Sequence, residues 1–111
     1  MPNTDIINNI KVLLRIAEDD SAFDSEINDL VLQCRDDLMA AGVKIIYLNF
    51  DSNFIEIDGN IRTCIVLYVK AFFGGAAGDI TSNGWFLKQY QYKKGNVLNQ
   101  QKYSGGDSND I

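Results

Sequence analysis

Apolar residues recur at helical spacing across residues 21–41, and this stripe constrains the fold more than any other feature of the sequence. Its members are Phe23, Ile27, Leu30, Val31, Cys34, Leu38 and Ala41. Spacings of three and four residues place them on one face of an α-helix. Asp24 and Glu26 suit the first turns, and Gly42 suits the left-handed position after the last turn. The only proline is at position 2, so the strongest helix breaker is absent from the rest of the chain.

The sequence predicts three further helices. Residues 5–17 carry an apolar face with the same spacing, and the acidic residues 18–20 mark its end because carboxylates are unfavourable at a helix C-terminus. A broader apolar surface over residues 58–73 indicates burial on two sides, so we expect this helix at the centre of the domain. A fourth helix is predicted to begin within residues 83–85, and Gly95 and Asn96 weaken its continuation toward Tyr103.

Residues 43–57 differ from the rest because β-branched and aromatic residues dominate them, with turn-forming residues in the middle. They predict a short β-hairpin or an extended arm between the second and third helices. The expected fold class is therefore mainly α, a small four-helix bundle with this hairpin or arm. Residues 1–103 are expected to form a single helical domain, and the polar residues 104–111 a disordered tail.

The composition argues against an enzyme. The chain has 111 residues and no histidine, which removes the usual general base and the usual zinc ligand. Cys34 and Cys64 lie in apolar periodic segments and are expected to be buried free thiols. The glycine-rich residues 73–79 follow a helix and lack the lysine of a phosphate-binding loop. We therefore predict no catalytic site, no metal site and no cofactor.

Charge is distributed unevenly along the chain. Residues 1–60 hold four basic and twelve acidic side chains, whereas residues 61–111 hold six basic and three acidic ones. Such halves attract when copies meet head to tail, although two solvated helix faces give the same pattern. We expect neither a signal peptide nor a membrane span, and we expect the protein in a reducing cytoplasm or in an assembly built there.

The last third of the chain interleaves aromatic and basic residues. Five aromatic residues fall within the nineteen residues 85–103, together with four lysines. Aromatic and cationic side chains act as hot spots in protein interfaces and as stacking platforms for single-stranded nucleic acid. The alternative is that Phe86 and Tyr90 close the core while the lysines are solvated.

The order of the helical segments carries a family resemblance. The acidic break EDDSAFDSEI (18–27) leads into a long helix with the pattern IxxLVxxCRxxL. IRTCIVLYVKAFFG (61–74), WFLKQYQYKK (85–94) and a glycine-containing tail follow. This arrangement resembles the head-tail connector, or head-completion adaptor, proteins of long-tailed phages and prophages. The resemblance covers about residues 4–103, and its most specific part is LYVKAFFG followed after a loop by FLKQY.

The resemblance implies a structural protein without enzymatic activity that forms a homo-oligomeric ring, dodecameric when assembled, beneath the portal protein. The ring would extend the channel, pass double-stranded DNA without specific binding, and receive a tail-side neck or stopper protein. It implies a location at the head–tail junction of the virion, and in the host cytoplasm during assembly. Its contacts with the portal or a neighbouring subunit would involve Trp85, Tyr90, Tyr92, Lys93, Lys94 and Tyr103.

Acidic side chains suit either the channel or the contact between subunits. A channel for double-stranded DNA must not grip its phosphates, and a net acidic wall repels them. The candidates for such a wall, or for an intersubunit surface, are Asp19, Asp20, Asp29, Asp36 and Asp37.

A second function remains open at this point. The basic, aromatic-rich C-terminal third also fits a small helical regulator that binds nucleic acid. That function predicts retention on DNA that fades as salt rises, whereas a connector predicts weak or no DNA affinity for the isolated chain.

Overall fold

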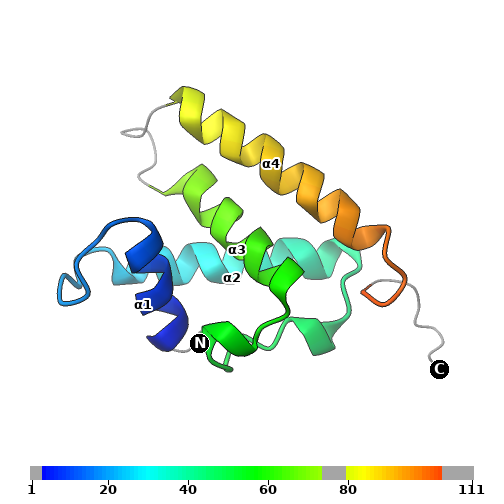
Figure 1. Cartoon of the computed structure of the whole chain (residues 1–111), viewed down its shortest axis with the longest axis horizontal. Coiled ribbons are helices and arrows are strands. Elements are labelled where there is room, and N and C mark those ends of the chain that lie inside the picture. The colour runs from blue at the N-terminus through cyan, green and yellow to red at the C-terminus, as the bar shows by residue number, and fades with distance from the viewer. Residues whose placement is uncertain (1–3, 74–79, 104–111) are drawn as a thin grey trace.

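The computed structural model describes residues 4–73 and 80–103, with the side chains of 4–73 and 84–103. These ranges contain the helices α1 (Thr4–Leu13), α2 (Asp24–Ala41), α3 (Gly59–Phe72) and α4 (Ile80–Leu98). Figure 1 shows α3 and α4 side by side and antiparallel, with α2 crossing behind α3 and α1 at one end. The prediction of a mainly α, bundle-like fold is confirmed.

The apolar stripe of residues 21–41 forms the buried face of α2. Its fully or nearly buried members are Ile27, Leu30, Val31, Cys34 and Leu38. The helix ends at Gly42, which has a φ of 112° and whose N–H donates to the carbonyls of Leu38 and Met39. A left-handed backbone of this kind favours glycine. Phe23, by contrast, is 39% exposed and packs edge-on against Phe73 instead of entering the core.

α3 is the central helix. Asp58 caps its start, because one carboxylate oxygen accepts hydrogen bonds from the amides of Asn60 and Ile61 at 2.9 and 3.3 Å. α2 packs on one side of α3 and α4 on another. Its buried residues are Ile61, Cys64, Ile65, Val69 and Ala71. The prediction of a central helix buried on two sides is confirmed.

The prediction of a β-hairpin or extended arm over residues 43–57 is wrong. No strand occurs in 4–73 or 80–103, and this segment forms the 3₁₀ turns η1 (Ile45–Tyr47) and η2 (Phe54–Glu56). The side chains of Val43, Leu48, Phe50 and Ile57 are at most 5% exposed, whereas those of Ile45, Ile46 and Ile55 are 67%, 74% and 80% exposed. The inward side chains do not alternate with period two. Packing against the helices therefore outweighs β propensity here.

Two helix ends differ from the sequence-based boundaries. α1 stops at Leu13, because Arg15 has a φ of 62° and the N–H of Ile16 donates back to the carbonyl of Lys11 at 2.8 Å. α4 begins at Ile80 and continues through Gly95 to Leu98. The predicted disordered tail lies outside the described residues. Within the described ranges, no helix has the length and apolar character that a bilayer span needs.

Candidate interaction surfaces

Both cysteine thiols are buried in the core. Cys34 and Cys64 are free, and neither side chain is exposed. Burial raises the pKa of the Cys34 thiol far above its ordinary value and raises the pKa of the Cys64 thiol to about 11. Neither thiol is therefore a nucleophile at neutral pH. Among the described residues, no group of three or more His, Cys, Asp or Glu side chains is placed to hold a metal ion.

Three side chains tie α2 to α4. Tyr90 is 2% exposed, and its hydroxyl donates to Oδ2 of Asp37 at 2.5 Å. The same oxygen accepts from Nζ of Lys94 at 2.9 Å. Partial burial alone would raise the pKa of Asp37, but the bonds from Tyr90 and Lys94 outweigh it, so the pKa lies below its ordinary value. The contact candidates Tyr90 and Lys94 and the acidic candidate Asp37 are thus used inside the molecule.

Tyr103 is the centre of a second internal contact, here called the Tyr103 clasp. The tyrosine is fully buried, and its hydroxyl donates to Asp58 Oδ1 at 2.7 Å and accepts from Asn60 Nδ2 at 2.9 Å. Nζ of Lys93 donates to Asn60 Oδ1 at 2.8 Å. The carbonyl of Tyr103 accepts from the amide of Lys44 at 2.7 Å. The clasp joins the chain after α4 to the start of α3 and to η1.

The acid in this clasp is also the N-cap of α3. Partial burial of the Asp58 carboxyl alone would raise its pKa. The hydrogen bonds from Tyr103, Ile61 and Asn60 outweigh that effect and hold the pKa below its ordinary value. Asp58 is therefore ionised at neutral pH and serves the fold.

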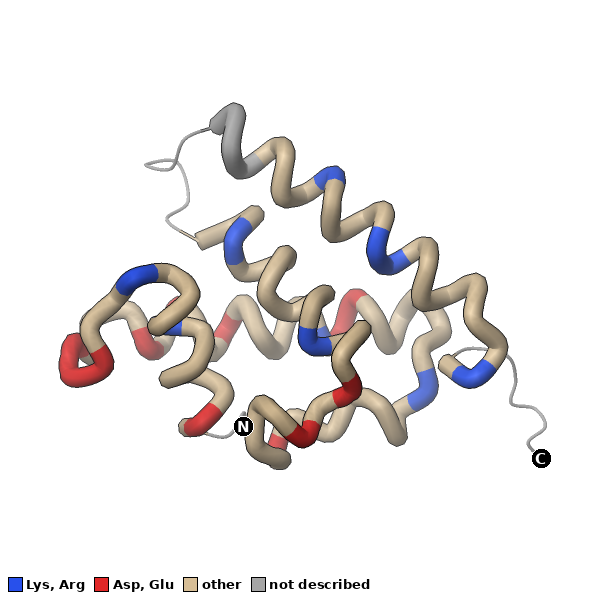
Figure 2. Tube along the Cα trace, in the orientation of Figure 1, with Lys and Arg blue, Asp and Glu red and all other residues tan. Residues whose placement is uncertain are grey.

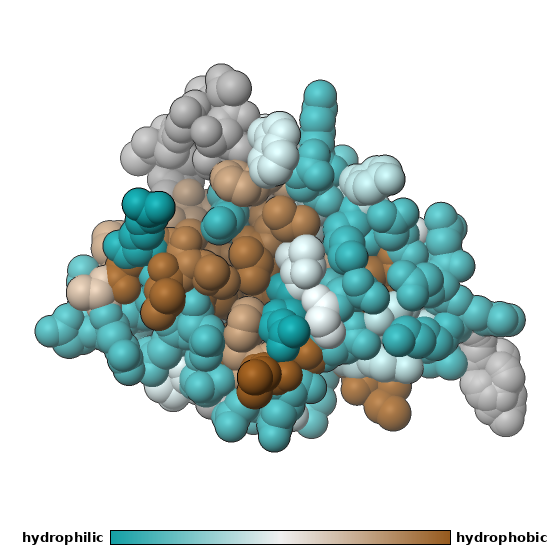
Figure 3. Space-filling model, in the orientation of Figure 1, coloured by the Kyte–Doolittle hydropathy of each residue, from teal (hydrophilic) through white to brown (hydrophobic). Residues whose placement is uncertain are grey.

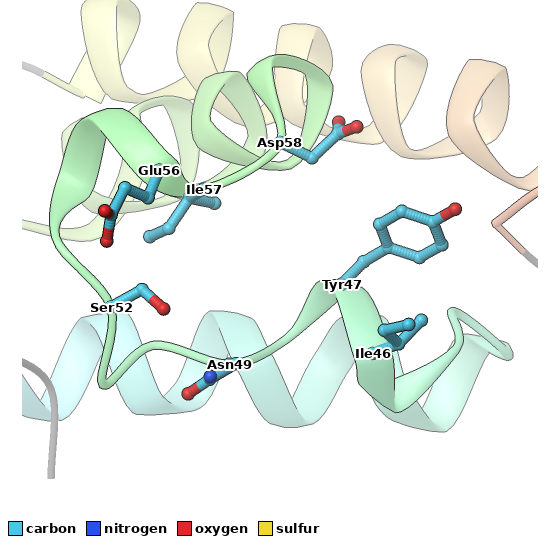
Figure 4. Close-up of a pocket in the computed structure, with 7 residues that line it drawn as sticks. All are labelled: Ile46, Tyr47, Asn49, Ser52, Glu56, Ile57 and Asp58. Atoms are coloured by element: carbon cyan, nitrogen blue, oxygen red, sulfur yellow. The ribbon is translucent and has the colours of Figure 1, made fainter.

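A cavity of about 370 Å³ lies between η1 and the start of α3 (Figure 4). It is lined by Ile46, Tyr47, Asn49, Ser52, Glu56, Ile57 and Asp58. The side chains of Asn49, Glu56 and Asp58 already have partners within the chain. The amide oxygen of Asn49 accepts from the Asp51 backbone, and the Glu56 carboxylate accepts from the Asn53 backbone. The cavity is therefore part of the local turn structure.

The α4 outer face, defined as Trp85, Lys88 and Tyr92, points away from the core. Trp85 is 56% exposed, Tyr92 is 71% exposed, and Lys88 is exposed between them. Separations of three and four residues place all three on one side of the helix. Figure 2 shows lysines on the middle part of α4. Of the six sequence-based contact candidates, only Trp85 and Tyr92 are largely exposed.

The acidic loop, defined as Glu18, Asp19 and Asp20, lies between α1 and α2 at one end of the molecule (Figure 2). All three side chains are exposed. The loop is held from below by Lys11, which is 1% exposed. Nζ of Lys11 lies 2.9 Å from the Glu18 carbonyl and 2.9 Å from Oδ1 of Asp24.

Sequence reasoning missed Lys11. Its position four residues after Ile7 and one residue after Ile10 places it at the edge of the apolar face of α1. A cation on that face just before a run of carboxylates is the signal that would have found it.

The remaining acidic candidates lie on α2. Asp29 and Asp36 are exposed and seven residues apart, close to two helical turns, so they share one face. The five acidic candidates therefore occupy three places: the acidic loop, this outer face of α2, and the internal contact of Asp37 with α4.

An apolar groove of about 310 Å³ separates α1 from α3. It is lined by Leu13, Phe54, Arg62, Thr63, Val66 and Leu67. Figure 3 shows hydrophobic residues gathered over α1 and α3 on this side of the molecule. Val12, next to the groove residue Leu13, is 69% exposed. Exposed apolar surface of this kind is typical of protein contacts, and no sequence-based candidate included it.

The chain matches a known protein family. A family model described as phage connector protein matches residues 6–104, a range that begins in α1 and ends one residue after Tyr103. No curated protein and no solved structure matches the chain.

Proposed function

Since the chain belongs to the phage connector protein family, we propose that its copies form a ring beneath the portal that extends the DNA channel and links head to tail. The observation that carries the proposal is the extent of the family match, which runs from within α1 through α2, α3 and α4 to the Tyr103 clasp. One side of the ring binds the portal protein, and the other receives a neck or stopper protein of the tail. The assembled ring is a dodecamer.

The distribution of exposed apolar side chains supports assembly. A closed ring needs two different surfaces on each subunit, because each contact is head to tail. This chain exposes apolar side chains on separate elements, including Val12 at the end of α1, Ile45 and Ile46 in η1, and Trp85 on α4. Side chains of this size on several elements give each subunit surfaces for neighbours, portal and tail protein.

The outer face of α2 suits the wall of a DNA channel. Asp29 and Asp36 point into solvent from this face and repel phosphates at any rotation of the duplex. A wall of this kind lets DNA slide, because no cations hold the backbone. In our proposal, this face lines the channel.

Reconstitution with the portal protein of the same phage tests the proposal. We expect the purified chain to bind portal particles, and electron cryomicroscopy of the complex to show a ring coaxial with the portal. Portal from an unrelated phage is the specificity control. A chain that stays monomeric and unbound at high concentration with its own portal would overturn the proposal.

The channel assignment has its own test. In portal-bound rings, the double variant Asp29→Lys/Asp36→Lys replaces two repelling charges by two attracting ones in each subunit. We expect such rings to retain a short DNA duplex that wild-type rings release, and to release it only as salt is raised. If the variant rings release the duplex as wild-type rings do, the outer face of α2 does not line the channel.

A further inference from the structure

We propose that the α4 outer face of one copy binds the acidic loop of a second copy. The inference rests on the proposed function, because it names the contact that would join neighbouring subunits. The partner of this exposed helix face is a second copy of this chain. Three features support the contact: complementary charge, the ordered backbone of both surfaces, and their separation within one molecule.

The α4 outer face has the composition of an interface centre. Trp85 and Tyr92 present large, exposed, amphipathic side chains about one turn before and one turn after Lys88. Aromatic residues of these types are enriched in hot spots. The inward side of the same helix holds Tyr90 and Val97, which are 2% and 0% exposed, so the core does not use the outer aromatics.

The acidic loop carries the complementary charge in a fixed arrangement. Glu18, Asp19 and Asp20 are consecutive and exposed. The Lys11 side chain holds the Glu18 carbonyl at 2.9 Å, and the Asp20 amide donates to the Ala17 carbonyl at 3.0 Å. A loop whose backbone is already ordered loses little conformational entropy when it binds.

The two surfaces lie apart in one molecule. In Figure 2 the acidic loop is at the left end, beyond α1, whereas α4 runs along the upper edge, beyond α3. A single copy therefore leaves both surfaces open, and each copy offers a donor surface and an acceptor surface. A contact between unlike surfaces of identical chains is heterologous, and it propagates from subunit to subunit until a ring closes.

The expected strength of one such contact is modest. Charges at the edge of an interface mainly set association rate, specificity and salt dependence. A ring adds the contacts of all its subunits and of the portal beneath it, which raises avidity without strengthening any one contact. The isolated chain should therefore self-associate weakly, with a strong dependence on salt.

Charge exchange tests the contact directly. Sedimentation velocity of the wild-type chain at low salt should show a sedimentation coefficient that rises with protein concentration and returns to the monomer value at high salt. Lys88→Glu alone and Asp19→Lys/Asp20→Lys alone should each weaken association by at least about tenfold, because both bring like charges together. An equal mixture of the two variants should restore association, since each surface then meets an opposite charge.

A matched control separates this contact from net charge. Asn99→Asp/Gln101→Glu changes the net charge by the same amount as Lys88→Glu, at exposed positions beyond the α4 outer face. It should associate as wild type does. Circular dichroism of every variant should match the wild type, because all substituted residues are exposed.

Three results would overturn the contact: wild-type chain that stays monomeric at every concentration and salt, single variants that associate as wild type does, or a mixture that does not recover. Failure of this contact can be distinguished from failure of the proposed ring function.

If both single variants form normal rings on portal, this contact is wrong and the ring function stands. If charge exchange behaves as expected but the wild-type chain never binds portal, the contact stands and the ring function is wrong.

Discussion

Tyr90 and Tyr103 join the C-terminal part of the chain to α2 and α3 through hydrogen bonds to aspartates. Tyr90 reaches Asp37 on α2, and Tyr103 reaches Asp58 at the start of α3. A hydroxyl that donates to an ionised carboxylate makes a stronger hydrogen bond than one between neutral groups. Both tyrosines are buried, so their hydroxyls would lose free energy if they had no partner.

Tyr90→Phe tests the value of the first bond. The variant keeps the ring but removes the donor to Asp37, and we expect the free energy of unfolding to fall by about 1–2 kcal/mol. Urea denaturation followed by circular dichroism measures it. Tyr92→Phe is the matched control on the same helix: its side chain is 71% exposed, so a change below about 0.5 kcal/mol is expected. Equal losses in the two variants would contradict the internal role of Tyr90.

The lowered pKa values of Asp37 and Asp58 predict acid sensitivity. A carboxyl whose pKa is lower in the folded state than in the unfolded state stabilises the fold above its unfolded pKa, about 4. That contribution disappears as the pH falls from there through the lowered folded pKa, because the unfolded chain binds protons first. The urea midpoint should therefore be flat near neutral pH and should decline below pH about 4.

Asp58→Asn supplies the comparison for that decline. The variant cannot ionise, so its stability at neutral pH should be lower and its dependence on acid pH shallower than in wild type. The two curves should converge at the most acidic pH. Parallel curves across the whole range would show that Asp58 does not contribute to the acid dependence.

At the level of single residues, the sequence predicted burial of the thiols but did not separate inward from outward aromatics. The burial of Cys34 and Cys64 could be predicted because each lies within an apolar helical stripe. Tyr90 and Tyr92 have the same composition around them, and only the register of α4 decides which one faces the core. The partner atoms of Tyr103 lie more than forty residues away in the chain, beyond any local pattern.

Whole elements also differ in how well the sequence predicts them. Apolar periodicity predicted α2 and α3 well, because both are long, buried and clearly capped by Gly42 and Asp58. It failed for residues 43–57, whose β-branched residues pack irregularly against helices that local propensity does not represent. It also extended the first helix past Leu13, where a left-handed Arg15 ends it.

Replacing a glycine by alanine should change stability in opposite directions at Gly42, after α2, and at Gly95, within α4. Gly42→Ala should destabilise the protein by about 1–2 kcal/mol, because its φ of 112° is unfavourable for any residue with a Cβ atom. Gly95→Ala lies within α4, and its added Cβ would meet no atom within 4 Å, so it should stabilise by up to about 1 kcal/mol. Thermal unfolding compares both with wild type. A stabilising Gly42→Ala would be inconsistent with the left-handed cap.

Lys11 links α1, the acidic loop and α2, so we expect its removal to lower the stability of the contact among all three. Lys11→Met keeps most of the buried aliphatic stem but leaves Asp24 and the Glu18 carbonyl without the ammonium. Although the Asp24 side chain is 43% exposed as a whole, the Oδ1 that contacts Lys11 is buried and would lose its charged partner, so we expect a loss of about 2–4 kcal/mol. Urea denaturation measures the loss.

Hydrogen exchange locates the effect. In Lys11→Met, amides of the acidic loop should exchange faster, while those of α3 should be unchanged relative to the shift in global stability. Lys70→Met, on the central helix, is the control and should leave the loop amides protected as in wild type. Loop exchange that does not respond to Lys11→Met would show that the loop is ordered by other contacts.

Across the whole molecule, part of the charge asymmetry of the sequence is used within the fold. Lys94 pairs with Asp37 at 2.9 Å, and Lys102 lies 3.9 Å from Asp58, so the basic second half binds the acidic first half inside one chain. The exposed acidic and basic side chains lie on different parts of the molecule. Carboxylates occupy the acidic loop and the outer face of α2, and Lys88 lies on α4.

This arrangement predicts how the isolated chain behaves toward nucleic acid. The net charge is −5, and two of the lysines in the aromatic-rich third, Lys93 and Lys94, are engaged with Asn60 and Asp37. Too little positive charge is left to displace counterions from a phosphate backbone. In fluorescence anisotropy at physiological salt, neither a duplex nor a single-stranded oligonucleotide should bind with a Kd below about 10⁻⁴ M, the weak end of non-specific binding.

The double variant Trp85→Ala/Tyr92→Ala makes the measurement decisive between two functions. For a connector, the variant should leave the weak nucleic-acid signal unchanged and should weaken self-association, because its aromatics contact protein. For a nucleic-acid regulator, the wild-type chain should bind the single strand with an affinity that falls steeply with salt, and the variant should lose about 1–3 kcal/mol for each stacked base. Salt-sensitive binding that depends on these two aromatics would assign the α4 outer face to nucleic acid and remove it from the contact between subunits.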